Sequence, residues 1–148
     1  LLQHEDAIES LDNALKCDSG NVNTAFYRGI VLGKMKKHEE ALNCFENIHQ
    51  KHPKHMDAFF HKGIELAELG KHKRALEIFD KLLQLHEENV NVIYAMARSH
   101  AATSNFDRAL YLLEQAVKKD RKTIKKWAIE DEFFDSLQNE PKFRKLVK

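Results

Sequence analysis

Four short segments, HEDA, HEEA, HKRA and FDRA, recur along the chain at a constant spacing. They end at Ala7, Ala41, Ala75 and Ala109, so each step is 34 residues. Recurrence with a period of about 20 to 50 residues is typical of chains built from stacked supersecondary units, in which each unit buries its apolar face against its neighbours. The sequence therefore predicts an array of similar units that share a continuous core.

Apolar residues recur at fixed distances from each alanine. They stand one, four and seven positions after it, as in Leu42, Phe45 and Ile48. These offsets lie on one face of an α-helix, which we interpret as the second helix of each unit. Twelve positions before the alanine stands a small residue, as at Gly29 and Gly63, where two helices of a hairpin can approach closely.

Breakers are scarce, with only five glycines and two prolines in 148 residues. This is too few for the many turns of an all-β chain, so we predict an all-α fold of helices joined by short turns. The predicted first helices span 21–34, 55–68, 90–103 and 122–130, and the predicted second helices span 4–17, 38–50, 72–86 and 106–119. Side chains at Asn21, Asp57 and Asn105 are the predicted N-caps.

The combined pattern of a bulky residue at the helix start, a small residue, an alanine, a large apolar residue and Pro53 near the repeat end resembles the tetratricopeptide repeat. The resemblance covers essentially the whole chain and implies a right-handed superhelix of antiparallel hairpins. It implies a single domain, 1–148, made of a truncated repeat's second helix at 1–20, repeats at 21–54, 55–88 and 89–122, and a half repeat with a C-terminal cap at 123–148.

Both ends depart from the repeat pattern. The first unit has only its second helix and the chain does not begin with Met, so we expect a fragment of a longer protein. The C-terminal segment interrupts the pattern at Pro141, and a solenoid needs such a segment to cover its last apolar face. The residues expected to pack onto the last hairpin are Phe133, Phe134, Leu137, Phe143 and Leu146.

First helices line the concave groove in proteins of this family, so the resemblance implies a ligand-facing surface there. An aromatic residue recurs at Phe26, Phe60 and Tyr94, in a column separate from the hairpin core. The alternative is that these rings pack between neighbouring first helices as core. The predicted groove residues are Asn23, Phe26, Tyr27, Ile30, Asp57, Phe60, His61, Ile64, Asn91, Tyr94, Arg98, Lys125 and Ile129.

The resemblance implies a protein-protein interaction scaffold that binds a protein or peptide in this groove. Some family members hold the C-terminal carboxylate of heat-shock chaperones with a clamp of Lys and Asn, then Asn, then Lys and Arg. The matching positions here are Phe26 and Ile30, then His61, then Asn91 and Ala95, so the clamp is absent. We expect the ligand to be an extended segment or helix with apolar anchors.

Two other classes of function remain as alternatives. A structural self-association module is the first, with a homodimer through the N-terminal edge, because the helix over 4–17 leaves Ile8, Leu11 and Ala14 without a hairpin partner. An enzyme is the second. The sequence has no GxSxG, no glycine-rich phosphate loop and no HExxH, so we expect neither catalysis nor a cofactor.

The histidines and the charges suggest few other ligands. His49, His52 and His55 are closely spaced, but Pro53 interrupts the helix between them, so no metal site is expected. Lys and Arg number 24 against 23 Asp and Glu, so no overall field attracts nucleic acid. The basic run KKDRKTIKK is interpreted as a solvated helix junction, with a site for nucleic-acid phosphates or for an acidic peptide as the alternative.

The location of the protein is inferred from its cysteines and its hydrophobicity. No run of 18 apolar residues occurs, so no membrane partner is expected. Cys17 and Cys44 form no CxxC pair and are interpreted as free thiols of a reducing compartment, with a disulfide as the alternative. We therefore expect a cytoplasmic protein.

Overall fold

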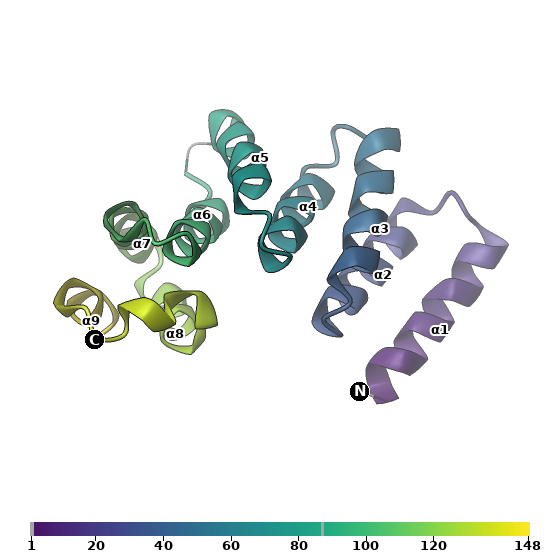
Figure 1. The fold of residues 1–148 in the computed structure, drawn as a ribbon. Helices are drawn as coiled ribbons and strands as arrows, with labels where there is room; N and C mark the ends of the chain where they lie inside the picture. The colour runs from purple at the N-terminus through teal and green to yellow at the C-terminus, as the bar shows by residue number, and fades with distance from the viewer. Residues whose placement is uncertain (1, 87) are drawn as a thin grey trace. The chain divides into compact units, whose positions relative to one another are not determined.

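The computed structural model describes residues 2–86 and 88–148, and every regular element among them is helical (Figure 1). This confirms the predicted all-α class, and the helices begin and end within two residues of the predicted bounds. The elements are α1 (Leu2–Cys17), α2 (Val22–Lys34), α3 (His38–Lys51), α4 (Met56–Glu68), α5 (His72–Leu85), α6 (Val90–Ala102), α7 (Phe106–Lys119), α8 (Arg121–Glu130), the 3₁₀ helix η1 (Glu132–Leu137) and α9 (Pro141–Val147).

The chain forms two compact units, Leu1–Lys71 and His72–Lys148. In the first unit α2 packs against both α1 and α3, and α3 packs against α4. In the second unit α6 packs against α5 and α7, and the C-terminal elements contact α6 and α7. Each unit therefore contains paired helices and has its own apolar interior.

The core of the first unit lies where α2 meets α3. Ala41, Phe45 and Ile48 of α3 are buried, which confirms the face inferred from their spacing. Gly29 of α2 lies directly against this face, since a Cβ atom added there would be only 2.7 Å from Phe45 Cζ. The close approach of the two helices thus requires a residue without a side chain at position 29.

A buried carboxylate links three helices of the same unit. Glu65 of α4 places Oε2 2.8 Å from Nδ1 of His38, the first residue of α3. Its other oxygen, Oε1, lies next to Gly33 of α2. A Cβ atom added to Gly33 would be only 2.6 Å from this oxygen. Burial raises the pKa of Glu65, and the contact with His38 opposes that rise. The carboxylate therefore fits a space made by a glycine and is partnered at one oxygen.

The N-caps agree only in part with the prediction. Asn21 accepts a hydrogen bond from the Thr24 N–H, as expected. The cap of α4 is not Asp57 but His55, whose Nδ1 accepts from the Ala58 N–H at 3.1 Å. Asp57 instead lies in the first turn, where a carboxylate still favours the positive end of the helix dipole. Asn105 precedes α7 but makes no side-chain cap bond.

The C-terminal segment caps the second unit. Phe134, Leu137 and Phe143 are fully or almost fully buried, and the rings of Phe134 and Phe143 lie 5.7 Å apart. Phe133 and Leu146 are half-buried. Because α9 contacts both α7 and α8, these aromatic rings cover the apolar side of the last helices, as expected for a solenoid end.

The packing at Gly29 generates a stability prediction. Gly29→Ala should lower the free energy of unfolding by about 1–3 kcal/mol, because the new methyl group overlaps the Phe45 ring in a well-packed core. Chemical denaturation measures the change. Gly20→Ala is the matched control, since a Cβ atom there meets only Asp18 Oδ1 at an ordinary 3.5 Å. Equal stability of the two variants would contradict the described contact.

Candidate functional site

The predicted groove residues of the first unit lie around one cluster of aromatic rings. Phe26 of α2 is half-buried, and its centroid lies 5.5 Å from His61, 5.3 Å from His55 and 5.7 Å from Phe45. Phe60 of α4 is also half-buried and meets His61 edge-on at 5.4 Å. The aromatic column is therefore partly packing and partly surface.

His61 lies at the centre of this cluster. Its ring stacks on Phe45 at 5.3 Å with an interplanar angle of 25°. Burial lowers the pKa of the His61 imidazole, and the nearby Asp57 carboxylate opposes that shift only in part. The imidazole is consequently neutral at pH 7 and serves as an aromatic packing group.

The solvent-exposed part of this face is small and centred on an aromatic ring. Tyr27 is 60% exposed, and its ring meets Phe26 edge-on at 5.9 Å. Asn23 and Asp57 are exposed, whereas Ile30 and Ile64 are half-buried. The face therefore presents a supported aromatic ring together with polar groups.

The predicted groove residues of the second unit lie in a different environment. Tyr94 is only 7% exposed, and its hydroxyl donates to Asp131 Oδ2 at 2.8 Å. Arg98 Nε lies 2.7 Å from the same oxygen, and its guanidinium lies 4.3 Å from the Phe133 ring centroid. The three aromatics are thus not equivalent, because the segment after α8 folds back and covers Tyr94.

The remaining predicted residues of the second unit are more accessible. Asn91 is exposed, Lys125 is half-buried and Ile129 is 55% exposed. Lys125 and Ile129 are one turn apart on α8, which places them on the same side of that helix. None of these three residues is part of the contacts that hold Tyr94.

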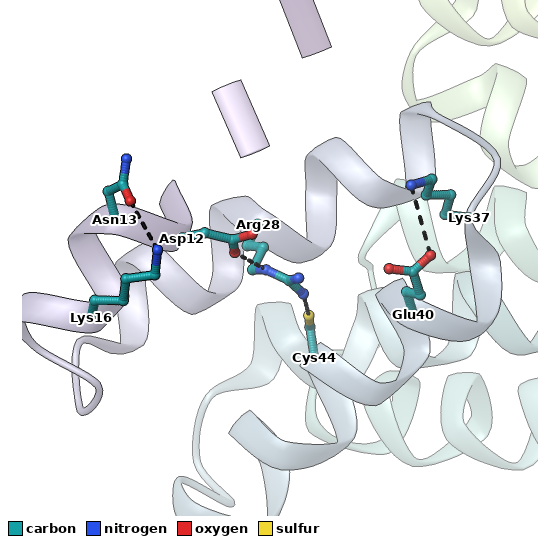
Figure 2. A network of polar contacts seen from close by, with 7 residues as sticks. All are labelled: Asp12, Asn13, Lys16, Arg28, Lys37, Glu40 and Cys44. Carbon is teal, nitrogen blue, oxygen red and sulfur yellow. Dashed lines mark hydrogen bonds and ion pairs between the residues drawn. The ribbon is translucent and has the colours of Figure 1, made fainter. Parts of the chain in front are cut away.

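A cavity that the sequence did not predict lies between α1, α2 and α3. It has a volume of about 370 Å³ and is lined by Leu15, Val22 and Ile48 among others. Arg28 also lines it, donating from Nε to Asp12 Oδ1 at 2.6 Å and from Nη1 to Cys44 Sγ at 3.3 Å (Figure 2). The cavity size is within the range of small-ligand pockets.

The ion pair between Asp12 and Arg28 was not predicted, although the sequence contains a repeated pair of opposite charges that indicates it. Shifting both residues by the repeat length gives Glu46 and Lys62, which also form an ion pair, at 3.5 Å. Each pair joins a second helix to the first helix that follows it. The charge columns therefore repeat with the apolar ones, and comparing acidic and basic positions across repeats would have revealed the contact.

Two of the clustered histidines and two lysines of the basic run have structural partners. His49 stacks on Phe59 at 4.3 Å, His55 caps α4, and no group of three His, Cys, Asp or Glu residues suited to a metal ion occurs in 2–86 and 88–148. Lys118 pairs with Glu114 at 2.9 Å and Lys119 with Glu88 at 3.4 Å. Both cysteines are free, and none of the described helices is long and apolar enough to cross a membrane.

Two family models, each described as tetratricopeptide repeat, match residues 26–90 and 66–128 and together cover most of the chain. The chain belongs to the tetratricopeptide repeat family. No curated protein sequence matches this one. The fold is accordingly a helical-repeat solenoid of this family. Membership of the family makes the protein a protein-interaction scaffold in the general sense.

Several solved structures share the fold. MamA (residues 41 to the end) from Desulfovibrio magneticus RS-1 is 15% identical with a TM-score of 0.73, over 97% of this chain and 84% of that one. A tetratricopeptide repeat protein from Parabacteroides merdae is 20% identical with a TM-score of 0.75, over 84% of this chain and 49% of that one. MamA of MSR-1 is 21% identical with a TM-score of 0.68, covering 82% and 70%. At these identities the likeness concerns the fold alone.

The position of His61 predicts a pH effect. Because its pKa is lowered in the folded protein, the unfolded chain takes up a proton more readily as the pH falls below the usual 6.5. The stability of the wild-type protein relative to His61→Phe should thus decrease from pH 8 to pH 5. Denaturant melts of both proteins across this range measure the difference, and a difference independent of pH would contradict the burial described.

Proposed function

We propose that the first-helix face of the first unit binds an extended segment or helix of another protein through aromatic and apolar anchors. The observation that carries the proposal is Tyr27, a large aromatic side chain that is 60% exposed although its ring rests on Phe26. Aromatic anchors of this kind supply much of the energy at protein interfaces. The expected partner is a protein or peptide whose identity the chain does not specify.

The surroundings of Tyr27 support this proposal. Tyr27 has a fixed aromatic neighbour, so ordering its ring on binding costs little conformational entropy. Asn23 and Asp57 are exposed, which provides the polar groups typical of an interface rim. Phe26 and Phe60, by contrast, are half-buried, with Phe26 against Phe45 and Phe60 against His61, and we assign them to both packing and binding.

The same proposal includes what the protein does not do. We expect no catalysis and no cofactor, in keeping with a scaffold whose described helices are joined by short turns rather than by long loops that would carry a catalytic group. We also propose a cytoplasmic location on the basis of the free thiols of Cys17 and Cys44.

Replacing Tyr27 tests the proposed surface. Tyr27→Ala should weaken partner binding by about 2 kcal/mol or more, as for an interface hot spot, whereas its effect on stability should be about 0.5 kcal/mol or less because the side chain is exposed. Paired pull-downs from source extract and thermal melts give the two values. Tyr111→Ala is the matched control, since this tyrosine of α7 is 52% exposed outside the proposed surface. The proposal fails if both variants retain the same proteins.

A second candidate function is self-association through α1, because its apolar face is less covered than the equivalent face of the other second helices. None of the described residues of α1 is buried. The positions equivalent to Leu11 are Phe45, Phe79 and Leu113, all of which are fully buried, whereas Leu11 itself is half-buried. An apolar face of this kind favours pairing with a second copy of the same helix.

Sedimentation of the protein over a range of concentrations tests this second function. We expect reversible dimers that Leu11→Glu abolishes, because a carboxylate would be buried without a partner in the paired face. Glu9→Gln, an exposed change on the same helix, should leave the dimers unaffected. A wild-type protein that stays monomeric at the highest concentration would exclude the idea.

A further inference from the structure

The predicted ligand face of α6 is occupied by the chain's own C-terminal segment. Tyr94 and Arg98 lie one turn apart on α6, in the same columns as Phe26 and Ile30 of α2. Both contact Asp131, which follows α8, and Arg98 also contacts Phe133 of η1. A short stretch of the protein therefore lies where the family resemblance implies a bound partner.

These contacts are specific in their chemistry. One carboxylate oxygen of Asp131 accepts from the Tyr94 hydroxyl at 2.8 Å and lies 2.7 Å from Arg98 Nε. The Phe133 ring lies below the Arg98 guanidinium and meets the His72 ring edge-on at 5.8 Å. An ion pair, a charge-assisted hydrogen bond and a cation–π contact thus select an acidic residue followed two positions later by an aromatic one.

The segment presents these two side chains through a local turn. Asp131 uses its second oxygen to accept from the Phe133 N–H at 3.1 Å, which caps η1 and keeps both side chains on the same side. The contact involves residues only two positions apart, so another chain with an acidic residue and an aromatic residue at this spacing can adopt the same turn.

The apolar attachment of the cap is made by residues other than Asp131 and Phe133, although one of them, Phe134, also lies 5.8 Å from the Tyr94 ring. Phe134, Leu137 and Phe143 are the buried residues of the segment, while Phe133 is only half-buried. The cap can therefore keep its apolar anchors if Asp131 and Phe133 leave α6. The polar and aromatic contacts of Asp131 and Phe133 are the part that a partner segment could replace.

We propose that the surface formed by Tyr94 and Arg98 of α6 together with His72 of α5 (the α6 surface) is a second binding site, which takes a protein segment with an acidic residue and an aromatic residue two positions later. In the free protein residues 131–133 hold it closed. The inference extends the proposed protein-binding function to the second unit. It does not involve the surface around Tyr27, so the two can fail independently.

Intramolecular occupation sets the expected affinities. A tethered segment acts at an effective concentration on the order of millimolar, so an external peptide binds weakly until the tethered one is released. Asp131→Ser with Phe133→Ala should release it, since the serine hydroxyl oxygen can still accept from the backbone N–H at position 133 and cap η1, but it is too short to reach Arg98. The anchors Phe134, Leu137 and Phe143 are unchanged in this released variant.

The test measures binding of a fluorescein-labelled peptide EDEFFDSL, residues 130–137, by fluorescence anisotropy. The released variant should bind it at least about tenfold more tightly than the wild type does. Adding Arg98→Ala to the released variant should weaken binding about tenfold. A control peptide with Asn in place of Asp131 and Ala in place of Phe133 should bind neither protein.

Three results would overturn the proposal. The first is a released variant that remains folded by circular dichroism and melting but binds the peptide no better than the wild type does. The second is equal binding of the control peptide, which would indicate nonspecific adhesion. The third is a wild-type dimer that the released variant loses, which would assign the α6 surface to a second copy of the chain. Loss of partner capture by Tyr27→Ala is measured separately and tests only the first surface.

Discussion

Close contact between paired helices at a small residue is the constraint on which the architecture depends. Where α2 meets α3, Gly29 lets the Phe45 ring lie against the helix backbone. The small, fully buried side chain of Ala41 lies on the same face of α3. The same columns recur every 34 residues, so one packing solution is used along the chain. Positions outside these columns are free to carry aromatic and charged groups, which is where the two proposed surfaces lie.

The sequence predicted the helices because a repeated pattern contains the same information several times. The spacing of Leu42, Phe45 and Ile48 identified the buried face of α3, and equivalent residues confirmed it in other units. The predicted N-cap of α4, Asp57, was wrong because the prediction considered the residue type and not the position of the helix start. His55 is a weaker capping residue than Asp57, but it occupies the position from which a side chain reaches the Ala58 N–H.

The candidate surfaces were less predictable because they depend on contacts distant in the sequence. The aromatic column drew attention to Phe26, Phe60 and Tyr94, but periodicity alone could not distinguish an exposed ring from a covered one. Tyr94 is covered because the chain leaves the repeat pattern after α8 and returns across α6. Tyr27 is exposed although its neighbour Phe26 has the more regular column. The difference in exposure between Tyr94 and the other two aromatic residues of the column thus arises where the C-terminal segment departs from the repeat pattern.

The contact between Glu65 and Gly33 bears on how freely repeats of this chain can be exchanged. The carboxylate of one repeat occupies the volume left by a missing side chain in the preceding repeat, and its other oxygen meets His38 of that repeat. Two adjacent repeats therefore fit each other through one carboxylate and one glycine. A repeat carrying Glu65, when placed after a neighbour with alanine at the position of Gly33, would have to move its carboxylate, because the new methyl group would lie only 2.6 Å from Oε1. The flexible side chain can turn aside, but its 2.8 Å contact with His38 would then be disturbed, so shuffling or consensus design keeps this contact intact when the two repeats are moved together.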